Sequence, residues 1–195
     1  MDTLTAFKIT QLAIICIFVV FISDIRKRPE ANALINQKMQ LALKLVYLFP
    51  LSVYVYSLIM LNYLTAFDLT AMIVTVTGTS VVVMAKTGLA DRHTWTGYCL
   101  NSNCFTTSGI YAYIRHPLYT GIYIFILGAA ITMFFHNFLL LNILLLASLV
   151  YIMSFLAVAA KRETVFLSEQ LGDSFKQYQI QVHPFLPLRK YKSIS

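Results

Sequence analysis

Charged residues are scarce in this sequence. Asp, Glu, Lys and Arg make up 12% of the 195 residues, whereas hydrophobic residues make up 58%, and the mean hydropathy is +0.72. A soluble domain carries about a quarter charged residues, so this chain has too little polar surface to be covered by water alone. The composition excludes an ordinary soluble globular domain and predicts a protein that is partly surrounded by lipid.

The motifs of soluble nucleotide-binding domains are also absent. The sequence has no Walker loop, no GxGxxG after a strand and no internal repeat. The net charge of +7 would suit nucleic acid, but basic residues in an apolar chain more often report membrane topology. We therefore expect membrane lipids, and no nucleic acid, as partners.

Cysteine is rare too, with three residues in the chain. Cys99 and Cys104 lie near His93, but the spacing is unusual for zinc and a fourth ligand is missing. We expect free thiols and no bound metal.

What the sequence does have is five apolar stretches, each long enough to span a bilayer, which takes about 20 residues. They run roughly over 5–23, 41–62, 65–85, 117–135 and 138–159. The first lacks a basic leading segment and a small-residue cleavage site, so we interpret it as a retained anchor. The third carries several threonines with Gly78 and Ser80, small and hydroxyl residues that favour close helix packing, and Pro50 should kink the second.

Basic residues predict the orientation of these spans. With the N-terminus outside, 14 of the 15 Lys and Arg residues fall on the cytoplasmic side, and Lys8 alone falls outside. A third segment that does not span would instead put both termini on the same side. His136 falls in a short outer turn with no charged neighbours in the sequence, and we interpret it as structural.

Polar residues gather in two cytoplasmic segments, a loop over 86–116 and a tail over 161–195. The tail has an apolar stripe at helical spacing, and Gly172 is expected to bend or break that helix. The tail is therefore either an amphipathic helix on the membrane or a lid over a site built with the loop.

Arg115, His116 and Pro117 mark the start of the fourth span. Proline is well placed in the first turn of a helix, where no backbone donor is lost. The resulting helix N-terminus, together with arginine, histidine and nearby tyrosines, suits an anion. The alternative is that these residues anchor the helix at the interface.

The segment TSGIYAYIRHPLYTG (107–121) resembles the signature G-x-Y-x-x-x-R-H-P-x-Y-x-G of the isoprenylcysteine carboxyl methyltransferases, which are integral-membrane enzymes. The tail ETVFLSEQLGDSFKQY (163–178), followed by Val182 and Pro187, is similar to a second family block. With the loop, the two blocks cover about half of the chain.

The resemblance implies S-adenosyl-L-methionine as methyl donor, enclosed by the loop and tail, and a lipophilic substrate that enters from the bilayer. Carried over by position, the cofactor contacts are Asn103, Cys104, Phe105, Thr106, Tyr111, His116, Pro117, Leu118, Tyr119 and Glu163.

Three positions depart from the family pattern. Thr164 replaces a second glutamate, Phe175 replaces a tyrosine, and Ala159 stands where the family has an arginine that orients the substrate. Arg162 lies close to the same helical face and could replace that arginine.

Because a C-terminal carboxylate is ionised at neutral pH, its methylation needs a cation and no base. We assign catalytic roles to Glu163, Arg162 and Arg115, and we expect carboxyl O-methylation of an isoprenylcysteine-type substrate. Phospholipid N-methylation, an NADPH-dependent sterol-type reduction and a non-catalytic membrane protein remain open alternatives. The predicted fold is all-α and forms a single membrane domain over 1–195, with three spanning helices in 1–85 and the site, with a helical hairpin over 117–159, in 86–195.

Overall fold

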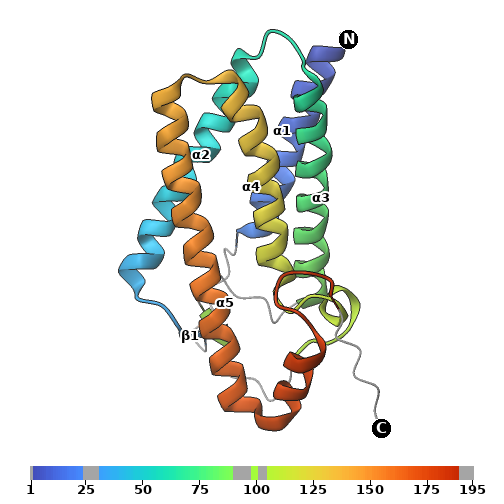
Figure 1. Cartoon of the computed structure of the whole chain (residues 1–195), viewed down its shortest axis with the longest axis vertical. Helices are drawn as coiled ribbons and strands as arrows, with labels where there is room; N and C mark the ends of the chain where they lie inside the picture. The colour runs from blue at the N-terminus through green and yellow to red at the C-terminus, as the bar shows by residue number, and fades with distance from the viewer. Residues whose placement is uncertain (1, 24–30, 90–97, 101–104, 189–195) are drawn as a thin grey trace.

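A computed structural model describes residues 2–23, 31–89, 98–100 and 105–188. Five helices run along the long axis of the molecule (Figure 1). They are α1 (Thr3–Ile22), α2 (Gln37–Met60), α3 (Ala66–Leu89), α4 (Pro117–His136) and α5 (Leu139–Gln181). Each is long and apolar enough to cross a membrane. The expected all-α, five-span protein is confirmed.

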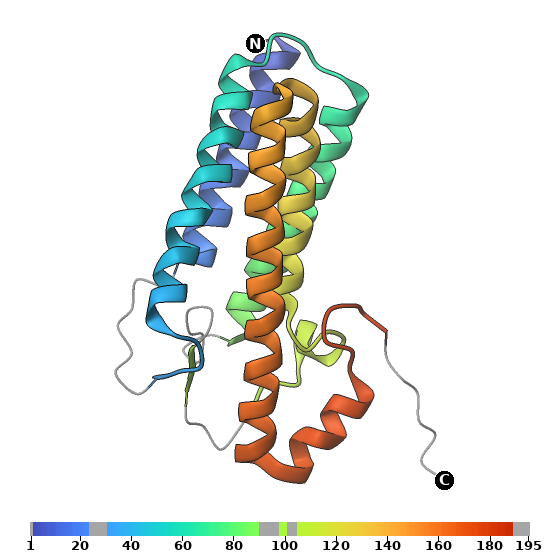
Figure 2. The ribbon, with the colours of Figure 1, turned by 60° about the vertical axis from the view of Figure 1, so that its left-hand side comes forward.

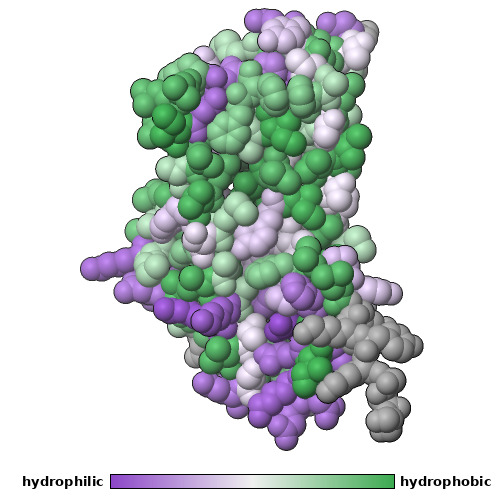
Figure 3. Space-filling model, viewed as in Figure 1, coloured by the Kyte–Doolittle hydropathy of each residue, from purple (hydrophilic) through white to green (hydrophobic). Residues whose placement is uncertain are grey.

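Polar and apolar surfaces separate along this axis. Apolar side chains cover most of the bundle, and hydrophilic side chains gather at its lower end (Figure 3). At this polar end lie the last residues of α1 and α3 and the first residues of α2 and α4 (Figures 1 and 2). It also carries the one described sheet, in which β1 (Ala31–Ala33) pairs antiparallel with β2 (Tyr98–Leu100), and the short 3-10 helix η2 (Gly109–Ala112).

Glycine brings α3 and α4 into direct backbone contact. A Cβ atom on Gly78 would lie 2.4 Å from the backbone nitrogen of Phe125, and one on Gly121 would lie 2.9 Å from the carbonyl oxygen of Gly78. On Gly128 it would lie 2.8 Å from the nitrogen of Thr75. The close packing expected of the third span is confirmed. Gly121 belongs to the signature, and its lack of a side chain permits this close approach. The contact fixes the position of the start of α4 relative to α3.

The last helix continues well beyond the bundle. α5 is 43 residues long, so the predicted fifth span and the predicted tail helix are parts of one helix. Gly172 interrupts it with φ 57° and ψ −132°, a conformation that L residues rarely adopt. After this bend, residues up to Gln181 run back toward the bundle (Figure 2). The expected effect of Gly172 is confirmed. Pro50 lies inside α2, which continues on both sides of it, and a kink at this position stays a prediction.

Candidate active site

His116 lies at the N-cap of α4 and meets two side chains from α5. Its Nδ1 atom is 3.5 Å from Oε2 of Glu163, and its Nε2 atom is 3.0 Å from Oγ1 of Thr164. The side chain of His116 is 8% exposed and that of Glu163 is 17% exposed. Because Pro117 begins α4 and fixes the direction in which the chain enters it, the histidine is aimed at α5.

Tyr119 completes this group of polar side chains. Its hydroxyl donates a hydrogen bond to Oε1 of Glu163, and its ring stacks near that of His116 with centroids 5.8 Å apart. A carboxylate has about four acceptor sites, of which Tyr119 uses one, while His116 lies 3.5 Å from the other oxygen. Glu163 therefore keeps acceptor capacity for a further donor, such as an ammonium group.

If the imidazole of His116 is neutral, its two contacts fit one tautomer better than the other. A carboxylate only accepts hydrogen bonds, so the proton of a neutral imidazole belongs on Nδ1, facing Glu163. Nε2 then accepts from the hydroxyl of Thr164. In this arrangement the threonine that departs from the family pattern occupies the basic lone pair of His116.

The part of α5 that follows Gly172 covers the residues that lead into α4. Tyr178 donates from its hydroxyl to the carbonyl oxygen of Tyr111 at 2.6 Å, and Gln179 donates to the hydroxyl of Ser168 at 2.9 Å across the bend. Tyr111 in turn donates to the carbonyl of Ala85 in α3 at 3.2 Å. Burial, followed by the charge of Glu163, raises the pKa of Tyr111, so its hydroxyl stays a neutral donor. The tail therefore lies over the loop, as expected of a lid.

Beyond α5, residues 182–185 form what we call the tail strap. It runs beside the start of α4, with an isolated parallel bridge between Ile114 and His183. The ring of Phe185 lies 5.9 Å from that of His116 and 5.6 Å from that of Tyr123, measured between centroids. The strap thus extends from the polar site to the apolar flank of α4.

Aromatic rings and an unpaired hydroxyl lie where the loop meets the tail. Phe105 packs edge-on against Phe175 at 5.1 Å and lies 5.2 Å from the ring of Tyr178. The hydroxyl of Thr106 is buried and has no hydrogen-bond partner among residues 2–23, 31–89, 98–100 and 105–188. Since buried polar groups are normally paired, this hydroxyl is available to a bound molecule. The predicted contacts Asn103 and Cys104 lie outside the described residues, as do His93 and the side chain of Cys99.

Comparison with known proteins gives the family. Residues 66–174, more than half of the chain, match the family described as phospholipid methyltransferase. The chain belongs to this family. The match begins in α3, covers the whole signature and ends just beyond Gly172, so it includes every side chain of the polar group around His116.

A named relative refines the comparison. Protein-S-isoprenylcysteine O-methyltransferase of Schizosaccharomyces pombe is 34% identical over 105 residues. That alignment covers 54% of this chain and 42% of the relative's own length. The resemblance to the isoprenylcysteine carboxyl methyltransferases that the signature indicated is confirmed.

The structure separates the two candidate catalytic arginines. Arg162 is exposed and donates from Nη1 to the carbonyl of Leu34, at 2.7 Å, just after β1. Arg115 is partly buried and donates from Nε to the carbonyl of Val182, at 2.9 Å, in the tail strap. Ala159, which stands where the family has arginine, is fully buried in the bundle. Within the described residues, neither arginine side chain pairs with the carboxylate of Glu163, and each instead binds a backbone carbonyl.

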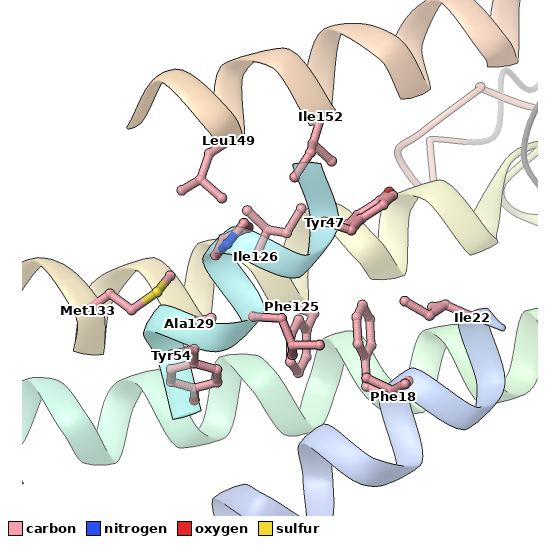
Figure 4. A pocket seen from close by; sticks show the side chains of 13 residues that line it. Phe18, Ile22, Tyr47, Tyr54, Phe125, Ile126, Ala129, Met133, Leu149 and Ile152 are labelled. Atoms are coloured by element: carbon pink, nitrogen blue, oxygen red, sulfur yellow. The ribbon is translucent and has the colours of Figure 1, made fainter. Parts of the chain in front are cut away.

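An apolar pocket lies inside the membrane part of the same bundle (Figure 4). Its walls come from α1, α2, α4 and α5, and include Phe18, Tyr47, Phe125, Met133 and Ile152. Tyr123 joins the tail strap to α5, because its ring lies beside that of Phe185 and its hydroxyl donates to the carbonyl oxygen of Met153. The sequence did not reveal this pocket, since all five spans are similarly apolar.

A second polar group lies at the opposite end of the bundle. Nε2 of His136 is 3.1 Å and 3.2 Å from the two carboxylate oxygens of Asp68, which is completely buried. Thr65 donates to the same carboxylate from its backbone and its hydroxyl. His136 has no charged neighbour in its own turn, but the fold brings Asp68, in the first turn of α3, against the end of α4, and this contact fits the structural role expected of His136.

Proposed function

We propose that this protein transfers a methyl group from S-adenosyl-L-methionine to a lipophilic acceptor at the cytoplasmic face of a membrane. The observation that carries the proposal is the meeting of His116 and Tyr119, from the signature, with Glu163, from the tail. His116 and Glu163 are 47 positions apart in the sequence, one in each of the two sequence blocks. The fold brings the two blocks together at the partly buried carboxylate of Glu163. The family match supports methyl transfer as the chemistry.

The side chains at the site fit this cofactor. Glu163 offers a carboxylate to its ammonium group, and the unpaired hydroxyl of Thr106 offers a hydrogen bond. The rings of Phe105, Phe175 and Tyr178 offer an apolar wall to its adenine. When bound, the cofactor supplies an electrophilic methyl group. Tyr111, Pro117 and Leu118 complete the set of residues that we expect around it.

The chain's own residues then position the reactants and exclude water. Glu163 is held by Tyr119 and His116, so its orientation is fixed before a ligand arrives. The tail beyond Gly172 covers the loop and shields the site from solvent. Because methyl transfer is an in-line displacement, this fixed geometry is the main contribution that the protein can make.

For the acceptor, we propose the carboxylate of an isoprenylcysteine-type substrate. An ionised carboxylate needs no general base, and Nε2 of His116 already lies 3.0 Å from the hydroxyl of Thr164 rather than facing open space. Arg162 is the better placed cation, since it is exposed and one hydrogen bond leaves most of its donors free. The apolar pocket inside the bundle suits the hydrocarbon part of such a substrate.

Phospholipid N-methylation is the second candidate, favoured by the description of the matched family. An amine acceptor must lose a proton, so this reaction requires His116 or Glu163 to accept one. Rotation of the Thr164 hydroxyl away from Nε2 would be needed to free His116.

Calorimetry of the purified protein in detergent tests cofactor binding. We expect S-adenosyl-L-methionine to bind, and His116→Ala and Glu163→Ala each to weaken binding at least tenfold. Absence of binding, or affinities unchanged in both variants, would show that this site does not hold the cofactor.

A further inference from the structure

We propose that Arg115 is a positioning residue that fastens the tail strap, and that the strap in turn holds His116 in the site. This inference rests on the proposed function for its consequence in catalysis, although its structural part can be tested without a ligand. It assigns separate tasks to the three consecutive signature residues. Arg115 binds the strap, His116 binds Glu163 and Thr164, and Pro117 begins α4.

Four hydrogen bonds join the start of α4 to the strap. The Nε–H of Arg115 donates to Val182 at 2.9 Å, and its backbone N–H donates to the carbonyl of His183 at 3.0 Å. The backbone N–H of His116 donates to Pro184 at 2.9 Å, and the hydroxyl of Thr120 donates to Phe185 at 3.1 Å. The carbonyls of four successive strap residues are therefore all engaged.

Arg115 supplies the charge in this set of contacts. Burial lowers the pKa of its guanidinium, with Tyr178 acting in the opposite direction, but an arginine stays charged at neutral pH. A hydrogen bond from a charged donor is stronger than one between neutral groups. Tyr178, on the turn of α5 before the strap, is bound to Tyr111. The hydrogen bond from Arg115 to Val182 therefore adds to the hydrogen bond from Tyr178 to Tyr111, which holds the last part of α5 in place.

The strap reaches His116 by two routes. It accepts the backbone N–H of His116, which fixes the backbone at the N-cap of α4. It also places the ring of Phe185 5.9 Å from the imidazole, which contacts Tyr119 as well. If the strap leaves, His116 loses both restraints, and its contacts with Glu163 and Thr164 lose their fixed geometry.

A direct role of Arg115 on the ligand is the competing explanation, and a double-mutant cycle separates the two. The variants are Arg115→Ala in the full chain, a chain that ends after Gln181 and so lacks the strap, and the combination of both. We expect Arg115→Ala to weaken S-adenosyl-L-methionine binding about tenfold in the full chain and to have no further effect in the shortened chain. An equal loss in both backgrounds, or full affinity of the shortened chain, would overturn the proposal. Should the shortened chain not fold, the measurement on the full chain described next decides between the two explanations.

A measurement without ligand keeps this inference separate from the proposed function. Histidine labelled with ¹³C at Cε1 reports the environment of His116 by NMR, and hydrogen exchange reports its backbone amide. In Arg115→Ala we expect the His116 signal to shift and its amide to exchange at least tenfold faster. Lys176→Ala, which removes an exposed cation from the same tail, should change neither. An unchanged His116 in Arg115→Ala would refute the positioning role even if the protein binds no cofactor.

Discussion

The imidazole Nδ1 of His116 lies 3.5 Å from Oε2 of Glu163, and this contact joins the start of one membrane helix to the middle of another. Thr164 binds the other nitrogen of the same ring. One face of α5 therefore determines how His116 is oriented.

Glu163→Gln tests the role of the carboxylate charge. The amide keeps the size of the side chain but cannot pair with an ammonium group, and a hydrogen bond to a charged group contributes about 1.5–3 kcal/mol. We expect the affinity for S-adenosyl-L-methionine to fall roughly 10- to 100-fold, measured by calorimetry. Glu169→Gln, which changes an exposed carboxylate on the same helix, is the matched control and should bind normally. Equal affinities for the two variants would remove Glu163 from the cofactor site.

Gly78→Ala tests the backbone contact between α3 and α4. The added Cβ would meet the backbone of Phe125, which cannot move as a side chain can. Overpacking of this kind costs about 1–3 kcal/mol, so we expect a clear fall in the melting temperature in detergent. Gly88→Ala is the control, because its Cβ would lie 3.4 Å from the ring of Tyr111 and make an ordinary contact. If both variants melt alike, the close approach does not determine stability.

The buried pair at the far end of the bundle gives a prediction about stability alone. His136→Ala leaves the carboxylate of Asp68 buried without its imidazole partner, and a buried acceptor that loses its partner costs about 1–3 kcal/mol. We expect a lower melting temperature and an unchanged affinity for the cofactor. In contrast, Lys176→Ala breaks an exposed pair with Asp173 and should leave the melting temperature as it is. A loss of cofactor affinity in His136→Ala would mean that the two ends of the bundle are coupled.

Orientation in the membrane can be measured with single cysteines. In a variant without native cysteines, Asn62→Cys lies in the connection between α2 and α3, and Ser174→Cys lies in the tail beyond Gly172. The distribution of basic residues predicts that a membrane-impermeant thiol reagent labels Cys at 62 from outside intact cells and labels 174 only after lysis. The reverse pattern would place the candidate active site on the outer face.

Several of these features were predictable from local sequence. The five apolar stretches predicted the five helices, Pro117 predicted the start of α4, and Gly172 predicted the bend in α5. Each depends on residues close together in the chain. Threonine and glycine in the third span also predicted close packing, because small side chains permit it whatever the partner.

Other features depend on contacts between distant segments and were not predictable. In the sequence, Thr164 is a departure from the family pattern. Nothing in the sequence indicated that its hydroxyl would reach His116. Asp68 and His136 are 68 positions apart and follow no periodic pattern. The strap after Gln181 has no regular structure of its own, and its carbonyls are engaged only because the start of α4 lies beside it.

Transfer of a labelled methyl group from S-adenosyl-L-methionine tests directly whether this protein methylates a carboxylate. The purified protein in detergent is supplied with a farnesylcysteine analogue, and in parallel with phospholipid, and the extracted product is treated with alkali. The account predicts label on the farnesylcysteine analogue that alkali releases as methanol, as expected of a methyl ester, and loss of this label in Glu163→Gln. Alkali-stable label on the phospholipid, with none on the analogue, would contradict carboxyl methylation and establish the amine acceptor instead. No transfer to either acceptor by a protein that binds the cofactor would contradict both.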